Sequence, residues 1–335
     1  MKLFMPDNHT PDIPEYTRAT PNDVGLVQKL LQINYPNISI TRIQSIGKVN
    51  INSKNFRVGQ YYVKIIKAYP GAEITLKVPL LHTLMRQAKI PLPAFVPNNH
   101  AQTVSIFPEE TRSQYYFYVQ RFIDAHFYTG MQTEFEIAMR ILKRQKGIFS
   151  SIDINDWPKK PYQNWTAHII FEKILSLPED NSPFDKLVRP EVPAFIKQAK
   201  GFDQTYPILN FSQLHHFDLH PHNFLFRNKV LHAVLDLESI SVVPYEIATA
   251  FNIYKLARKS IATHNMTLDE VRKVAGTFFN LEYLRPFAIY ELVRRLGVVL
   301  KLHYLEKNKV WDQDLLKHMI GLHEVDLIFR QKSFA

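Results

Sequence analysis

Three side chains between residues 216 and 238 have the types and spacing that phosphoryl transfer requires. Asp218 is followed by Asn223 and, further along the chain, by Asp236. In this chemistry one Asp orients the incoming hydroxyl, while an Asn and a second Asp hold Mg²⁺ against the nucleotide phosphates. The spacing therefore predicts a catalytic role for Asp218 and metal-binding roles for Asn223 and Asp236.

The pattern around these residues predicts a short hairpin. Pro221 and Asn223 are turn residues, and they precede one apolar run at 224–226 and another at 230–235. Two such runs joined by a turn pair as antiparallel strands. Asn223 and Asp236 would then lie at the two ends of the hairpin, folded back beside Asp218.

Residues 216–223, with the sequence HFDLHPHN, resemble the catalytic loop of the aminoglycoside phosphotransferase and choline kinase superfamily. Residues 235–238 resemble its metal-binding segment. The resemblance implies a small-molecule kinase that uses ATP and Mg²⁺, with Asp218 and His216 in its catalytic loop. Phe217 differs from the family, which usually has Gly or another small residue there. The structural alternative is that His216 and Asp218 only cap a buried turn.

The resemblance also implies an α+β fold with two lobes, like that of protein kinases: a small antiparallel sheet and a mostly helical second lobe. The predicted boundaries are an extended arm at 1–20, a nucleotide-binding N-lobe at 21–123 and a helical C-lobe at 124–335. The hinge would be 119–123. The C-lobe would carry the catalytic loop at 216–223 and the metal-binding segment at 235–238.

Two N-lobe segments are similar to the family's phosphate-binding parts. Lys64 lies between Val and Ile on a predicted strand, as the nucleotide lysine does. Residues 47–55 take the place of the phosphate-covering loop. They contain a single Gly, but their polar end is similar to the family's, which makes Ser53 and Asn55 candidate ATP ligands. An ordinary surface loop is the alternative.

Residues 118–124 look like the hinge whose backbone meets the adenine, so Gln120 and Phe122 are further candidates for nucleotide binding. The acid partner of Lys64 is open. Glu73 is the only acid in the helix predicted at 72–89, and the family's Glu would align near Lys77.

Two further groups have competing interpretations. Four histidines at 215, 216, 220 and 222 suggest zinc, but they lack a Cys partner. His216 is instead expected to bond the backbone and brace the catalytic loop. Glu238 would lean to the same side as Asp236 on an extended segment, either to reach a second metal through water or to face solvent.

Composition narrows the class of protein. The chain has 335 residues, 46% of them apolar, which suffices for two cores. No apolar run approaches the roughly 18 residues of a membrane span, and the first residues lack an apolar signal core, so a cytoplasmic protein is expected.

The absence of cysteine excludes disulfides. The net charge is +10, but no basic block or stacking motif supports nucleic-acid binding. Oligomeric state is not encoded in any recognisable pattern.

Apolar periodicity predicts the main elements. Strands are expected near 38–46, 56–66, 95–96, 104–106 and 115–122, with a hairpin turn at 58–61. Helices are expected at 24–33, 72–89, 133–147, 165–177, 245–259, 268–280, 281–305 and 315–329.

Three functional interpretations follow. The leading one is a kinase that phosphorylates a hydroxyl of a small metabolite. A catalytically silent nucleotide-binding module is the second. A protein kinase is disfavoured, because Asp-Phe-Gly and Ala-Pro-Glu segments are missing and only about nine residues separate Asp236 from the helix at 245.

The acceptor is expected to be an amino alcohol, a hydroxy amino acid or a sugar. An aminoglycoside-modifying enzyme is the alternative, but a polycationic drug needs carboxylates around it. Residues 245–335 carry 14 Lys and Arg against 10 Asp and Glu. Four of these basic residues, Arg285, Arg294, Arg295 and Lys301, lie on the helix expected near the cleft, where solvent exposure is their alternative.

Overall fold

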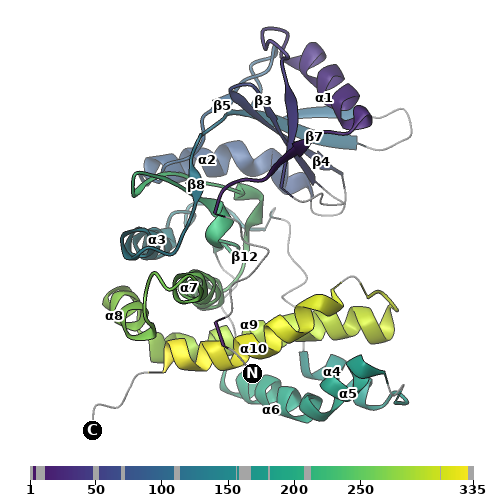
Figure 1. Cartoon of the computed structure of the whole chain (residues 1–335), viewed down its shortest axis with the longest axis vertical. Coiled ribbons are helices and arrows are strands. Elements are labelled where there is room, and N and C mark those ends of the chain that lie inside the picture. Colours follow the sequence, from purple (N-terminus) through teal and green to yellow (C-terminus); the bar gives the residue numbers. More distant parts are fainter. Residues whose placement is uncertain are drawn as a thin grey trace.

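The computed structural model describes residues 3–4, 12–47, 53–68, 72–108, 114–155, 157, 167–179, 182–206, 213–309 and 311–330. The centre of the predicted phosphate loop, 48–52, and part of the predicted N-terminal arm lie outside these ranges. The described residues form an antiparallel sheet above a helical lobe, joined by the segment after β7 (Figure 1).

The sheet of the N-terminal lobe is antiparallel throughout, in the order β1-β2-β3-β4-β7-β5, with β6 also paired to β7. Its strands are β1 Tyr16–Arg18, β2 Ile43–Ile46, β3 Ser53–Val58, β4 Tyr61–Lys67, β5 Phe95–Val96, β6 Ser105–Pro108 and β7 Gln114–Arg121. The predicted turn between β3 and β4 is confirmed: Gly59 has φ of +56°, a backbone conformation that Gly adopts without penalty. β1 lies within the arm predicted to be merely extended.

Two helices pack on this sheet. α1 (Pro21–Asn34) starts at an N-cap, Thr20, and buries Val27, Leu30 and Leu31 against one face. α2 (Val78–Gln87) lies between the sheet and the helical lobe (Figure 1). The predicted helix at 72–89 is therefore too long. Residues Ala72–Lys77 form a 3₁₀ turn instead, because Pro79 has no N–H to extend an α-helical ladder back into that turn.

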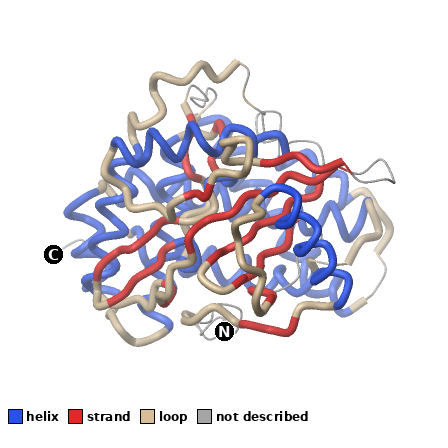
Figure 2. Tube along the Cα trace, turned by 90° about the horizontal axis from the view of Figure 1, so that it is seen from above, coloured by secondary structure: helices blue, strands red, loops and turns tan. Residues whose placement is uncertain are grey.

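The second lobe is helical, with short strand pairs on the side that faces the sheet. Its helices are α3 Gln132–Gln145, α4 Ala167–Leu175, α5 Pro183–Val188, α6 Val192–Thr205, α7 Tyr245–Ala262, α8 Leu268–Phe278, α9 Leu281–Leu300 and α10 Asp312–Phe329. Seen from above, the strands cross over a layer of helices (Figure 2). The predicted helices are confirmed here, with ends that differ by a few residues. α9 ends early because its last turn widens to a π-helix at Lys301–Leu305.

Two small sheets, one of two strands and one of three, carry the segment with the candidate catalytic residues. β9 (Leu214–His216) pairs with β12 (Ile240–Val242), while β10 (Phe224–Arg227) pairs with β11 (Val230–Val234) and β8 (His126–Phe127). Asn228 and Lys229, with φ of +52° and +63°, form the tight turn between β10 and β11. The predicted hairpin is thus confirmed, and its ends meet where Leu235 N donates to Asn223 O at 2.9 Å.

No helix within the described ranges is long and apolar enough to cross a membrane.

Candidate active site

The loop that carries Asp218 is braced from two helices and from the neighbouring hairpin. On α7, the fully buried Asn252 donates to His216 O at 2.9 Å and accepts from Leu219 N at 2.9 Å. Gln145 at the end of α3 accepts from His216 N at 3.1 Å. The His216 ring bonds Leu235 O at 2.9 Å through Nε2. These contacts fix the backbone on both sides of Asp218, and they place His216 as a structural support of the loop.

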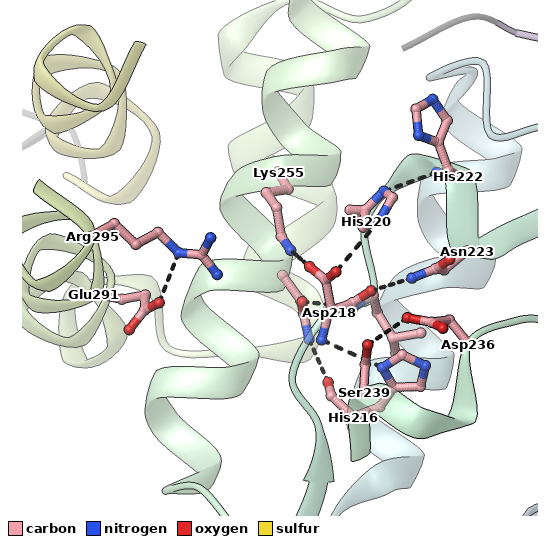
Figure 3. Close-up of polar contacts among 12 residues, drawn as sticks. His216, Asp218, His220, His222, Asn223, Asp236, Ser239, Lys255, Glu291 and Arg295 are labelled. Carbon is pink, nitrogen blue, oxygen red and sulfur yellow. Dashed lines mark hydrogen bonds and ion pairs between the residues drawn. The ribbon is translucent and has the colours of Figure 1, made fainter. Parts of the chain in front are cut away.

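Asp218 lies within a group of cationic and imidazole side chains (Figure 3). Its Oδ1 forms an ion pair with Lys255 Nζ on α7, and its Oδ2 lies 3.6 Å from His220 Nε2. Burial alone would raise the pKa of Asp218, but the Lys255 ammonium outweighs this and holds the pKa well below its usual range. Asp218 is therefore a carboxylate at neutral pH, and its side chain is 37% exposed and open to a partner.

The two candidate metal ligands meet beside Asp218. Asn223 donates through Nδ2 to Asp218 O at 2.6 Å, which leaves its own side-chain oxygen for another partner. Asp236 has a left-handed backbone, φ +61° and ψ +52°, and Ser239 Oγ donates to its Oδ2 at 2.5 Å. The left-handed turn directs the carboxylate of Asp236 back toward the hairpin end that carries Asn223.

Lys64 on β4 has two acid partners, and both come from the segment at 236–238. Its Nζ lies 2.7 Å from Asp236 Oδ1 and 3.1 Å from Glu238 Oε2. Glu238 is fixed further by Tyr118 on β7, whose hydroxyl donates to Oε1 at 2.6 Å. Burial would lower the pKa of Lys64, but the two carboxylates raise it well above its usual range, so the ammonium is retained.

These contacts answer the two open questions about acids. Lys64 has acid partners in Asp236 and Glu238, which lie outside the segment at 72–89. Glu238 does not face solvent, because 11% of its side chain is exposed.

A cavity of about 480 Å³ lies between the lobes, and most of the candidate residues line it. The five nucleotide candidates, Lys64, Ser53, Asn55, Gln120 and Phe122, are in its wall. So are the metal candidates Asn223 and Asp236, whereas Asp218 and His216 lie outside its lining. Within the wall Asn55 accepts from Tyr62 Oη at 2.7 Å, and Arg57 stacks 4.2 Å from the Phe122 ring. Two of the five nucleotide candidates, Asn55 and Phe122, are thus fixed by neighbouring side chains.

The donor set suits Mg²⁺. The carboxylates of Asp236 and Glu238 and the amide oxygen of Asn223 are hard oxygen ligands, which this ion prefers. Within the described residues no group of three or more His, Cys, Asp and Glu side chains is arranged to hold a metal, and this includes the four clustered histidines. Of these, His215 packs its ring 5.3 Å from Tyr245 and is 2% exposed.

His215 predicts a pH dependence of stability. Burial lowers its pKa from 6.5 to about 4, so the unfolded chain binds a proton more readily than the folded one between these values. Stability from this group is fully present above pH 6.5 and is lost as pH falls toward 4, with a change on the order of 3 kcal/mol.

His215→Phe keeps an aromatic ring against Tyr245 but cannot titrate. Urea unfolding at pH 7 and pH 4.5 should show the free energy of unfolding of the wild type falling relative to that of the variant. Parallel changes in the two proteins would contradict the assignment.

The pairing of Lys64 predicts unequal effects of two conservative changes. Glu238→Gln puts an amide N–H against either Lys64 or Tyr118, because both oxygens of Glu238 already accept. Mg-ATP affinity, measured by calorimetry, should fall by about tenfold, the loss of one buried charge-assisted hydrogen bond. Glu73→Gln should change it by less than about twofold. An equal or larger effect at Glu73 would contradict this pairing.

The four basic residues on and just after α9 differ in their burial and in their partners. Arg294 is buried and binds Glu291 through two N–H groups at 2.7 Å each, so solvent exposure is wrong for it. Arg285 pairs with Asp326, and Lys301 pairs with Glu306 at 2.7 Å. Arg295 points toward the Asp218 group (Figure 3).

Lys255 and Asn252 did not emerge from the sequence patterns. The signal for Lys255 was a lone cation in a run of α7 whose neighbours Ile253, Tyr254, Leu256 and Ala257 are all buried. Charged side chains are rarely tolerated in such a run unless they are paired.

Solved structures provide the comparison. A spectinomycin phosphotransferase in complex with ADP and spectinomycin is similar with a TM-score of 0.60 and 16% identity, over 91% of this chain and 97% of that one. An amicoumacin kinase in complex with AMP-PNP, Ca²⁺ and Ami gives 0.60 and 12%, over 92% and 94%. Choline kinase from Streptococcus pneumoniae gives 0.54 and 10%, over 90% and 99%.

No protein-family model and no curated protein matches the sequence. The similar structures span nearly the full length of both chains, and at these identities they establish the fold. The prediction of a two-lobed, kinase-like α+β fold is therefore confirmed. The chain has the fold of the small-molecule phosphotransferases typified by aminoglycoside phosphotransferases and choline kinase.

Proposed function

We propose that this protein is an ATP-dependent kinase that transfers the γ-phosphoryl group to a hydroxyl of a small metabolite, such as an amino alcohol, a hydroxy amino acid or a sugar. The observation that carries the proposal is that Asn223 and Asp236 line the cavity between the lobes, where Asp236 pairs with Lys64 and Asn223 bonds the backbone of Asp218. In this proposal 21–123 is the nucleotide lobe with its hinge at 119–123, and 124–335 is the helical lobe. The need for ATP places the activity in the cytoplasm.

The chain's own residues divide the work. Asp218, a carboxylate at neutral pH, orients the acceptor hydroxyl and accepts its proton. The acceptor oxygen forms a bond to the γ-phosphorus as the bond from that phosphorus to the β,γ-bridging oxygen breaks, and ADP leaves. Lys64 stabilises the negative charge of the phosphates. Bound Mg²⁺, held by Asn223 and Asp236, would supply further charge neutralisation at the β- and γ-phosphates.

A silent nucleotide-binding module is the second candidate. One contact favours it: Lys255 already occupies an oxygen of Asp218, the atom type that must receive the acceptor proton. In the kinase this contact holds Asp218 ionised and leaves Oδ2 for the hydroxyl. In the silent module it would block the site. The kinase and the silent module would both bind Mg-ATP, so nucleotide binding does not distinguish them. Only the kinase would turn over.

The test is transfer of label from [γ-³²P]ATP into a panel of amino alcohols, hydroxy acids, sugars and aminoglycosides, with Mg²⁺ present. A labelled small molecule is expected. Kanamycin should be a poor acceptor, because its ammonium groups would meet Lys255 and Arg295 rather than carboxylates. Binding of Mg-ATP with no labelled product from any acceptor would favour the silent module, and efficient labelling of kanamycin would favour the aminoglycoside alternative.

A further inference from the structure

Arg295 is a cation whose hydrogen-bonding capacity is only partly used. Its Nε donates to Glu291 Oε1 at 2.8 Å, while its two Nη groups donate to none of the described residues. The guanidinium is turned toward Lys255 and Asp218 (Figure 3). A guanidinium edge with free N–H groups matches the oxygens of a carboxylate.

An aromatic platform holds Arg295 in this position. Its guanidinium carbon lies 4.2 Å from the centre of the Phe251 ring and 5.7 Å from that of Phe217, and the two rings stack at 6.2 Å. Phe217 takes the place in the catalytic loop where the similar family usually has Gly or another small residue. The departure thus has a physical role here, because Phe217 supports a cation beside the catalytic Asp.

Positive side chains outnumber negative ones in the group around Asp218. Glu291 serves two guanidinium groups, since Arg294 binds both of its oxygens and Arg295 binds one of them. On the other side of the group, Lys255 pairs with Asp218. Each carboxylate facing Arg295 is therefore already committed to another cation.

The histidine side chains near Arg295 add no further charge to the group. Burial lowers the pKa of His220 to about 4 and that of His318 on α10 to about 3, so both are neutral at pH 7. Arg295 and Lys255 repel each other across the group, a repulsion that lowers the pKa of Lys255 in the same direction as its burial. A single negative charge bound between them would relieve it.

We propose that the acceptor is a small hydroxy acid whose carboxylate binds Arg295, with Lys255 beside it, while Asp218 orients its hydroxyl; this rests on the kinase function proposed above. The carboxylate takes no part in the bond changes and serves for recognition. An acceptor whose charge near the hydroxyl is an ammonium meets two cations and no uncommitted carboxylate. Arg295 is thus a specificity-determining residue.

The test uses pairs of acceptors in which the second member lacks the carboxylate of the first: glycerate with glycerol, where a hydroxymethyl group replaces it, and serine with ethanolamine and homoserine with 3-aminopropan-1-ol, where hydrogen replaces it. Phosphorylation from Mg-ATP and the thermal shift caused by each compound are measured for the wild type. The carboxylate member of at least one pair should be preferred about tenfold or more in kcat/KM, and it should give the larger shift. Glycerol 3-phosphate is added, and a preference for it over glycerate would overturn the carboxylate assignment.

Arg295→Met should lower the preference for the carboxylate member about tenfold, mainly through KM for that member. Arg295→Lys keeps the positive charge but lacks the paired N–H groups of a guanidinium. Its preference for the carboxylate member should therefore lie between that of the wild type and that of Arg295→Met. Lys301→Met is the matched control, since it removes one positive charge from the end of the same helix, where Lys301 pairs with Glu306. It should retain the wild-type preference. Melting temperatures show whether each variant is folded.

The outcomes separate this inference from the function beneath it. If neutral and carboxylate members are phosphorylated equally well, the kinase stands and the inference fails. If no compound is phosphorylated although Mg-ATP binds, the kinase fails, and acceptor recognition is decided by the thermal shifts. The proposed binding of a carboxylate by Arg295 would be overturned by equal thermal shifts within every pair of acceptors. It would also be overturned if Arg295→Met had the same preference as the wild type.

Discussion

Asp218→Asn should lower kcat for phosphoryl transfer by at least about a hundredfold while leaving the fold and Mg-ATP binding close to those of the wild type. Loss of a positioned proton acceptor costs roughly 10²–10⁴ in rate. The amide is isosteric with the carboxylate, so its oxygen can still accept from Lys255 Nζ. The backbone of the loop is held independently by Asn252 and Gln145. The change is therefore confined to the basicity and charge of one side chain.

Three measurements are needed for Asp218→Asn. Turnover is followed by coupled detection of ADP, nucleotide affinity by calorimetry with Mg-ATP, and stability by the melting temperature. Asn252→Ala is a useful contrast, because it removes the brace and leaves the carboxylate, and it should lower the melting temperature as well as the rate. A folded Asp218→Asn variant that turns over at the wild-type rate would remove Asp218 from the mechanism and with it the proposed role of the catalytic loop.

The motif around Asp218 was predictable because its geometry is local. Asn223 and Asp236 are joined by one hairpin, and the turn residues and alternating apolar runs of that hairpin are visible in the sequence. The register of β3 and β4 was predictable for the same reason: Gly59 sets a two-residue turn, and Asn55 is then opposite Lys64. Periodicity also marks most helices, because one face of each is buried.

The partners of the ionised groups could not be predicted in the same way. Lys64 and Asp236 are 172 positions apart, and their contact depends on how the lobes pack. Lys255 reaches Asp218 across 37 positions from a helix that looks like core throughout. The 3₁₀ turn at Ala72–Lys77 was missed because the apolar pattern continues through it, although Pro79 marks the change. Long-range electrostatics, then, decide the details of this site, and patterns along the chain do not record them.

Asp236→Asn should abolish the part of Mg-ATP stabilisation that depends on Mg²⁺ and lower turnover by orders of magnitude. Asn is preferred to Ala here for a structural reason. Asp236 has a left-handed backbone, which Asn tolerates far better than Ala does, so the turn into Leu237–Ser239 should survive. Lys64 keeps Glu238 as a carboxylate partner in the variant and is not left as an unpaired buried charge.

The measurement is the melting temperature with ATP alone and with ATP plus Mg²⁺. In the wild type the metal should add to the shift, because a ligand that binds only the folded protein stabilises it by mass action. In Asp236→Asn the two shifts should coincide. Ser239→Ala is the matched control: it removes the hydroxyl that bonds Asp236 Oδ2 but keeps the carboxylate, so most of the Mg²⁺-dependent shift should remain. If Asp236→Asn retains the full shift, Asp236 is not the metal ligand, and its contact with Lys64 must serve to hold the two lobes together instead.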